Sequence, residues 1–216
     1  MPSSTTHRLL LPWVHQDLLE HTGPKTYRMG PELFRLSALI GRKFEVQRLA
    51  RPLLTALWKE WQETSVLCLF HTSTLTATVA ESIPSPQPLK YELLAHSPVS
   101  LVWGSLGLAI LAHLPAATID EVLRHAQPGP ISNAPLAPHK SILKALARIR
   151  GRRYALYHKQ TVDVAGVSAA ILHGDGRIVG SLGVILPASR FTRAVQARLP
   201  GTIVHSATAL SNMLKS

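Results

Sequence analysis

Histidine and cysteine are the side chains in this chain best suited to acid–base, nucleophilic or metal chemistry, and neither occurs at the spacing such chemistry needs. The 216 residues include eleven histidines and one cysteine, Cys68. We find no H-E-x-x-H pattern and no paired Cys/His set with zinc spacing. Cys68 lies in the apolar run 66–70, which favours a buried structural thiol over a nucleophile. The sequence therefore predicts no metal site and no cofactor.

Other enzyme motifs occur only as isolated fragments. Ser141 and Lys144 match S-x-x-K, but they lie on a basic helix without the motifs that accompany that pattern in enzymes. Residues 174–176 followed by Gly180 miss the dinucleotide-binding spacing, and G-x-S-x-G does not occur. We therefore predict that the protein is not an enzyme.

The charge balance points to a polyanionic partner. Lys and Arg number 23 against 12 Asp and Glu, giving a net charge of +11. Such an excess favours nucleic acid, although a basic surface without a site would have the same composition. A basic cluster in the second half of the chain could contact phosphates, but we interpret it as a solvated helix face. Its members are His139, Lys140, Lys144, Arg148, Arg150, Arg152 and Arg153.

Cysteine usage and apolar runs bear on the compartment. One cysteine excludes a disulfide within the chain and fits the reducing cytoplasm. Residues 1–6 are polar and Pro12 follows the short run 9–11 at once, so we expect no signal peptide. Residues 99–114 are almost free of charge but shorter than the ~20 residues of a spanning helix. We expect a buried helix there, a cytoplasmic protein and no membrane association.

The N-terminal elements follow from caps, apolar spacing and breakers. Residues 3–20 predict a helix that Pro12 should kink or end, because proline lacks an N–H and clashes with the preceding turn. A turn over 21–25 and a strand over 26–29 should follow. Helices are then expected over 31–43, ended by Gly41, and over 45–61, bent by Pro52.

The rest of the chain alternates between strand and helix patterns. Strands are expected at 65–71 and 77–83, as a pair, and at 89–95, 154–157, 162–172 and 177–186. Helices are expected at 104–113, 118–126, 139–150 and 189–214. The sequence His173-Gly174-Asp175-Gly176 predicts a hairpin turn, since Asp-Gly readily supplies positive φ. This order suggests an α+β fold, a sheet layered with helices.

Several segments, taken in order, resemble the bacterial IclR regulators. Residues 4–10 resemble the recognition-helix core, and 27–30 the end of the wing. Residues 49–53 resemble the first helix of the effector domain, 88–91 with 106–112 the region of the pocket helix, and 174–190 the last hairpin. Their order and spacing together identify the chain as similar to IclR-type regulators over nearly its whole length.

The resemblance implies a domain plan and partners. It implies a partial winged helix-turn-helix over 1–30 and a linker helix over 31–44. Residues 45–216 would form a GAF/profilin-like effector domain, an antiparallel sheet flanked by helices. Expected partners are promoter DNA, a small-molecule effector and further copies of the chain in a homodimer or tetramer. The function implied is effector-controlled, DNA-binding transcription regulation.

The resemblance also places the DNA contacts, on the recognition helix and the wing. The residues are Ser3, Ser4, Thr5, Thr6, His7, Arg8, Lys25 and Arg28. The two helices that precede the recognition helix in the family have no counterpart here, so Leu9, Leu10, Trp13 and Leu18 would lose packing partners. We therefore expect residues 1–30 to be marginally ordered. The alternative function is a stand-alone effector-sensing or oligomerisation domain without DNA binding of its own.

The effector positions follow from the family's pocket between a helix start and the sheet. They are Gly104, Ser105, Leu106, Gly107, Leu156, Tyr157, Gly166, Gly183 and Ile185. Backbone N–H groups at the helix start could bind a carboxylate, or the glycines could simply permit close packing. The family's small polar positions are replaced here by larger or apolar residues. We therefore expect a larger, more apolar pocket that takes a hydrophobic or aromatic effector, for instance an aromatic acid.

Overall fold

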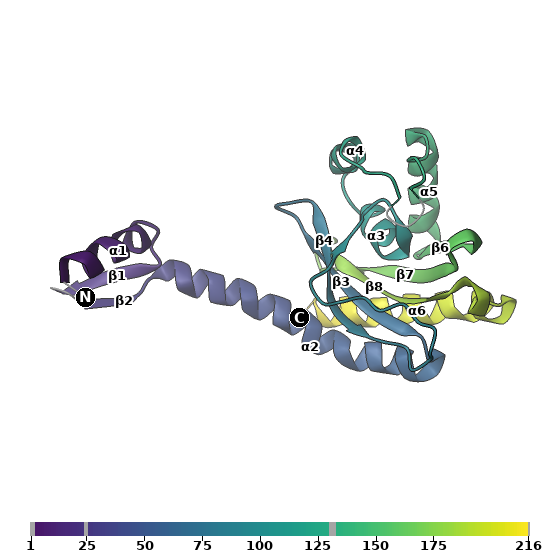
Figure 1. Cartoon of the computed structure of the whole chain (residues 1–216), viewed down its shortest axis with the longest axis horizontal. Coiled ribbons are helices and arrows are strands. Elements are labelled where there is room, and N and C mark those ends of the chain that lie inside the picture. Colours follow the sequence, from purple (N-terminus) through teal and green to yellow (C-terminus); the bar gives the residue numbers. More distant parts are fainter. Residues whose placement is uncertain (1–2, 24–25, 130–132, 216) are drawn as a thin grey trace. The chain divides into compact units, whose positions relative to one another are not determined.

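The computed structural model describes residues 3–23, 26–129 and 133–215, and for residues 3–5 and 37–44 it describes the backbone alone (Figure 1). The chain divides into two compact units, Met1–Arg48 and Leu49–Ser216. The first holds α1 (Ser3–His15), the hairpin of β1 (Leu19–Gly23) and β2 (Thr26–Met29), and the start of α2. This helix–hairpin order agrees with the sequence prediction.

Pro12 does not end α1, although ending the helix was one of the two outcomes expected from the sequence. The helix continues through it to His15. Proline removes one N–H donor, but the turn that follows closes on other donors: Asp17 N–H donates to Val14 O at 3.0 Å and Leu18 N–H to Trp13 O at 2.9 Å. Because Pro12 lies in the last turn of α1, only a short stretch has to tolerate the missing bond.

The two helices expected over 31–61 are one. Helix α2 runs unbroken from Pro31 to Trp61, with Pro52 inside it. Gly41 therefore ends no helix, and the expected boundary there is wrong. A glycine inside a helix lowers the stability of the helix by about 1 kcal/mol relative to alanine. Good helix formers around it can offset this loss.

The second unit is built on a six-stranded antiparallel sheet in the order β5-β4-β3-β8-β7-β6. The strands are β3 (Thr64–His71), β4 (Thr76–Ile83), β5 (Pro98–Val99), β6 (Ala155–Lys159), β7 (Val164–Leu172) and β8 (Ile178–Pro187). The α+β prediction is confirmed. Residues 89–95 are not a strand, and the ladder takes Pro98–Val99 instead.

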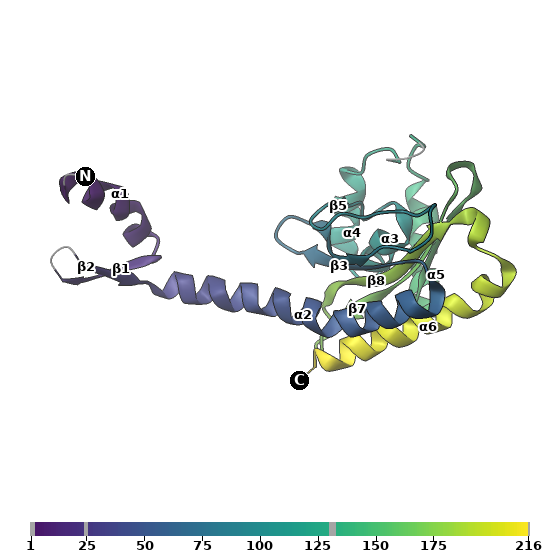
Figure 2. The ribbon, with the colours of Figure 1, turned by 60° about the horizontal axis from the view of Figure 1, so that its bottom comes forward.

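Helices cover both faces of this sheet (Figure 2). On one face lie α3 (Gly104–Leu111), α4 (Ala116–Arg124) and α5 (His139–Arg152), and on the other lie α6 (Arg193–Met213) and the end of α2. Helix α3 holds six buried residues, so the apolar run 99–114 contributes to the core as predicted. Among the described helices, none has the length and apolarity needed to cross a membrane.

The last hairpin and the helical tail follow the sequence pattern with one change. The β7–β8 turn has Gly176 at φ +82°, and His173 N–H donates to Arg177 O at 2.8 Å. The tail is split into a short 3-10 turn, η2 (Ala188–Arg190), and α6, which begins at Arg193. Thr192 Oγ1 accepts the Val195 N–H at 3.4 Å and so caps α6.

Candidate functional site

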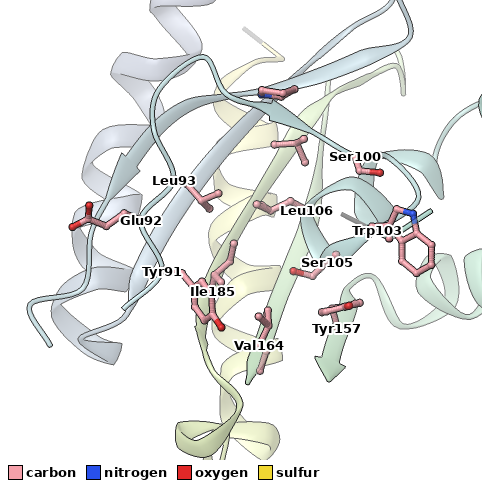
Figure 3. Close-up of a pocket in the computed structure, with 16 residues that line it drawn as sticks. Tyr91, Glu92, Leu93, Ser100, Trp103, Ser105, Leu106, Tyr157, Val164 and Ile185 are labelled. Carbon is pink, nitrogen blue, oxygen red and sulfur yellow. The ribbon is translucent and has the colours of Figure 1, made fainter. Parts of the chain in front are cut away.

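A cavity of about 200 Å³ lies between the start of α3, the strands β6, β7 and β8, and the segment 91–100 (Figure 3). Most of its lining is apolar or aromatic. The lining residues are Tyr91, Glu92, Leu93, Pro98, Val99, Ser100, Trp103, Gly104, Ser105, Leu106, Gly129, Tyr157, Val164, Ala165, Gly166 and Ile185. A concave apolar site with a few polar groups is the usual form of a small-molecule site.

One wall is a cross-strand row. Tyr157 pairs with Gly166, and Gly166 pairs with Ile185 on the next strand. A Cβ on Gly166 would lie 2.7 Å from Ser105 Oγ, so the glycine lets α3 approach the sheet. Ser105 Oγ also lies 2.8 Å from Ser168 Oγ, a buried hydroxyl pair at the start of α3. This pair fixes the helix start over the row.

Tyr91 holds the segment that covers the row. Its hydroxyl donates to Val162 O at 3.0 Å and Asp163 O at 3.1 Å, and its carbonyl accepts from Thr64 Oγ1 at 2.7 Å. Burial raises the pKa of the Tyr91 phenol, and the charge of Asp163 adds to the rise. Tyr91 is therefore a neutral donor at neutral pH, and these three bonds fix the wall in place.

The cavity interior carries little charge. Glu92 is charged, but its carboxylate lies 3.3 Å from Lys90 Nζ, its side chain is 59% exposed, and Figure 3 shows it pointing away from the other labelled lining residues. No lysine or arginine is found among the described residues that line the cavity. At the start of α3, Trp103 makes no side-chain capping bond. The N–H groups there and the hydroxyls of Ser105 and Tyr157 are polar groups that a ligand oxygen could meet.

Six of the nine predicted effector positions line this cavity: Gly104, Ser105, Leu106, Tyr157, Gly166 and Ile185. Gly107, Leu156 and Gly183 lie outside the lining of this cavity. A Cβ on Gly107 would lie 1.7 Å from Ser100 O, and one on Gly183 would lie 2.1 Å from Ser168 Oγ. Both glycines therefore serve close packing. Leu156 neighbours Tyr157 on β6, so its side chain points to the opposite face.

The sequence analysis missed lining residues on either side of these positions. Tyr91 and Leu93 lie in the segment expected to be a strand, whose role as a wall depends on long-range bonds that no local pattern shows. Val164 could have been found, because it precedes Gly166 by two residues on one strand and therefore shares its face.

In the first unit, Thr6, His7 and Arg8 are exposed on α1. His7 Nδ1 lies 2.6 Å from Tyr27 Oη, and the His7 and His21 ring centroids lie 5.8 Å apart, so α1 is tied to the hairpin. Arg28 donates to Glu20 at 2.7 Å across the two strands. Lys25 is outside the described residues, as are the side chains of Ser3, Ser4 and Thr5.

The basic cluster around α5 is partly structural. Arg150 donates to Ala112 O at 2.8 Å, Arg152 to Tyr154 O at 2.7 Å, and Arg153 to Thr208 Oγ1 at 3.0 Å. His139 Nε2 lies 2.9 Å from Asp120 Oδ1. The other members, Lys140, Lys144 and Arg148, are exposed. This distribution agrees with a helix face that is mostly solvated.

Two predictions about chemistry can be compared with the structure. Cys68 is fully buried on β3, and burial raises the pKa of its thiol, which confirms a structural cysteine. Within the described part of the chain, no group of three or more His, Cys, Asp and Glu residues is placed to hold a metal ion.

Comparison with known proteins adds a family match. The family described as bacterial transcriptional regulator IclR C-terminal matches residues 39–212. The regulator BhcR of Paracoccus denitrificans is 25% identical over 224 residues, covering 98% of this chain and 76% of its own length.

Solved structures share the fold. A putative IclR transcriptional regulator from Silicibacter sp. TM1040 superposes with a TM-score of 0.75 at 22% identity, over 100% of this chain and 85% of that one. The IclR protein of Thermotoga maritima gives a TM-score of 0.73 at 19% identity, over 99% and 86%. At these identities the likeness concerns the fold, and ligands have to be argued from this chain.

Proposed function

Since the chain belongs to the IclR family of bacterial transcriptional regulators, we propose that a hydrophobic or aromatic effector binds the cavity at the start of α3 and controls the binding of promoter DNA. Members of the family are regulators rather than enzymes, and they bind DNA and small-molecule effectors and form oligomers. In this proposal residues 1–30 are a partial winged helix-turn-helix, 31–44 a linker and 45–216 the effector domain, in a homodimer or tetramer in the cytoplasm.

The observation that carries the effector proposal is the lining of the cavity. Six positions chosen from sequence line a cavity of about 200 Å³, and the described residues around it are mostly aromatic and aliphatic and include no lysine or arginine. A small polar acid would lose its strong hydration in this cavity and find few hydrogen-bond partners in return. An aromatic ring or an aliphatic group instead gains binding free energy when its apolar surface is buried. A single carboxylate or carbonyl oxygen on such a ligand could be held by the N–H groups at the start of α3.

The effector proposal is tested by a thermal-shift screen of hydrophobic and aromatic acids against glyoxylate and pyruvate. We expect the aromatic compounds to raise the melting temperature. Ile185→Trp should abolish that rise by filling the cavity. Ile178→Trp is the matched control, since Ile178 is also a partly buried residue of β8 but does not line the cavity. Stabilisation by glyoxylate- or pyruvate-sized acids alone would overturn the proposal.

For DNA, we propose that the exposed side chains of α1 and the hairpin contact the duplex. The candidates with described side chains are Thr6, His7, Arg8 and Arg28, to which the sequence adds Ser3, Ser4, Thr5 and Lys25. The bond from Tyr27 gives His7 a second role, because it holds α1 against the hairpin. Arg28 is 68% exposed although it pairs with Glu20, so it could contact a phosphate.

The DNA proposal is tested by fluorescence-anisotropy titration of the chain against its own upstream intergenic duplex and a scrambled one, at two salt concentrations. We expect tighter binding to the native duplex that weakens with salt. A plot of the logarithm of the DNA-binding constant against the logarithm of the salt concentration has a slope that reports the number of phosphate contacts. Arg8→Gln should reduce the magnitude of this slope by about one, as the loss of one phosphate contact does. Lys140→Gln, an equal loss of charge on α5, should not. Weak and equal binding to both duplexes would favour the alternative, a stand-alone effector-sensing or oligomerisation domain.

A further inference from the structure

A second cavity, of about 280 Å³, shares no lining residue with the effector cavity. It is bounded by the end of α5, the last residues of β7, the β7–β8 turn and the last turns of α6. Its lining residues are His113, Arg153, Ala169, Ala170, Leu172, His173, Gly174, Gly176, Val204, Ala207, Thr208, Ser211, Asn212 and Lys215.

The cavity forms where the sheet loses a strand. Strand β6 begins at Ala155, which pairs with Ser168, while β7 runs on to Leu172. Residues 169–172 of β7 therefore have no partner on β6. A strand edge without a partner presents unpaired backbone donors and acceptors. One of these is met by a side chain, since Leu172 N–H donates to Ser211 Oγ at 3.0 Å.

Basic side chains surround this edge from four segments of the chain. Arg153, in the left-handed conformation at φ 68°, donates to Thr208 Oγ1 at 3.0 Å and so is held at the cavity. Lys215 Nζ donates to Asn212 Oδ1 at 2.9 Å. His113 Nδ1 lies 3.0 Å from Ala109 O, and the fourth basic side chain is His173. Each cation still has further donors to offer, because arginine carries five N–H groups and lysine three.

The described part of the lining contains no acidic side chain. The carboxylate of Asp175 lies 3.5 Å from His173 Nδ1, but it is held by Arg177, whose Nε lies 2.6 Å from Asp175 Oδ2. Hydrogen bonds from the Arg177 backbone and side chain lower the pKa of Asp175. Arg177 therefore partly neutralises the Asp175 carboxylate that contacts His173.

We propose that this cavity is a phosphate site, which takes inorganic phosphate or the phosphate group of a small ester. A tetrahedral dianion accepts several hydrogen bonds from different directions. Arg153 and Lys215 can supply such donors from two separate segments, and His113 and His173 border the same cavity. The apolar floor of Ala169, Val204 and Ala207 would receive the organic part of an ester. The effector cavity is less suited to such a ligand, because its described lining residues include no lysine or arginine.

The test measures phosphate binding by the whole chain. Inorganic phosphate and phenyl phosphate are titrated separately, with chloride at matched ionic strength as the reference, and followed by melting temperature and by phosphorus NMR line width. We expect both to raise the melting temperature above the chloride reference. Tighter binding of phenyl phosphate would identify an ester as the ligand, and equal binding would identify free phosphate.

Two variants locate the site. Lys215→Gln, at an exposed position that leaves the fold intact, and Arg153→Gln should each weaken phosphate binding on the order of tenfold. Lys140→Gln removes the same charge from another part of α5 and should leave it unchanged. Ile185→Trp should also leave it unchanged, which separates this site from the effector cavity. The proposal is overturned if phosphate acts no better than chloride, if all charge variants lose binding equally, or if Lys215→Gln and Arg153→Gln weaken only DNA binding.

Discussion

Cys68 lies in the middle of β3 with its side chain inaccessible to solvent. Burial disfavours the thiolate, so the pKa of Cys68 is raised in the folded chain. The unfolded chain then loses this proton at a lower pH than the folded chain does. The associated stability is complete below the unfolded pKa, about 8.5, and is lost as the pH rises above it.

This linkage gives a measurable pH dependence. Between pH 7.5 and 9.5 we expect the free energy of unfolding from urea titrations to fall by about 1.4 kcal/mol through Cys68 alone. Cys68→Ala removes the titrating thiol. The free energy of unfolding of this variant should therefore fall by about 1.4 kcal/mol less between pH 7.5 and 9.5 than that of the unchanged protein, even if the variant is less stable at pH 7.5. Identical pH slopes in the two proteins, or fast alkylation of Cys68 under native conditions, would contradict this account.

The cavity-lining positions that were predicted came from the resemblance to the family. Gly104, Ser105 and Leu106 map onto the start of the family's pocket helix, and Tyr157 and Gly166 map onto strand positions of its pocket; all five line the cavity. Gly183 and Gly107 have the same composition signal as binding glycines, but each faces an atom that leaves no room for a Cβ. That distinction depends on a partner far away in the chain, which sequence spacing does not reveal.

At the scale of elements, the sequence predicted helices and turns correctly where neighbouring residues favoured the same structure. It predicted helix ends wrongly where one residue disfavoured the helix that its neighbours favoured. Asp-Gly at 175–176 predicted the last hairpin, the apolar run 99–114 predicted the buried helix α3, and the basic segment 139–150 was expected to be helical, as α5 is. Gly41 and Pro12 oppose helix, yet α2 and α1 continue through them, because the cost of one poor residue is small beside that of breaking a helix. Propensity is a weak guide when only one residue opposes its neighbours.

The segment 84–97 shows the opposite error. Residues 89–95 within it were expected to form a strand, but Tyr91 bonds elsewhere: its carbonyl accepts from Thr64 Oγ1 at 2.7 Å, and its hydroxyl donates to Val162 O at 3.0 Å. Nearby, Arg190 pairs with the buried Glu63 through two hydrogen bonds of 2.5 and 2.7 Å, and these bonds raise the pKa of Arg190. These contacts join residues up to 127 positions apart. They position the cavity wall and η2, and no local pattern encodes them.

For the whole molecule, the two units differ in how much apolar surface they bury. In the first unit, Leu9, Trp13, Met29 and Phe34 are 57%, 53%, 67% and 67% exposed. The second unit has a core of fully buried side chains, among them Leu67, Leu182 and Ile203. Because burial of apolar surface is the main stabilising contribution, the first unit should open far more often than the second.

Native-state amide exchange tests this difference residue by residue. We expect residues 4–19 to exchange with little protection, while β3, β7 and β8 exchange at the rate of global unfolding. A helix whose apolar side chains stay half-exposed gains little from packing, and a helix of this length is marginal alone. Phe34→Ser, which removes an exposed apolar group, should leave the protection of the sheet unchanged. Slow exchange across residues 4–19 would mean that Leu9 and Trp13 are covered in solution, and protection that rises with protein concentration would identify a second copy of the chain as the cover.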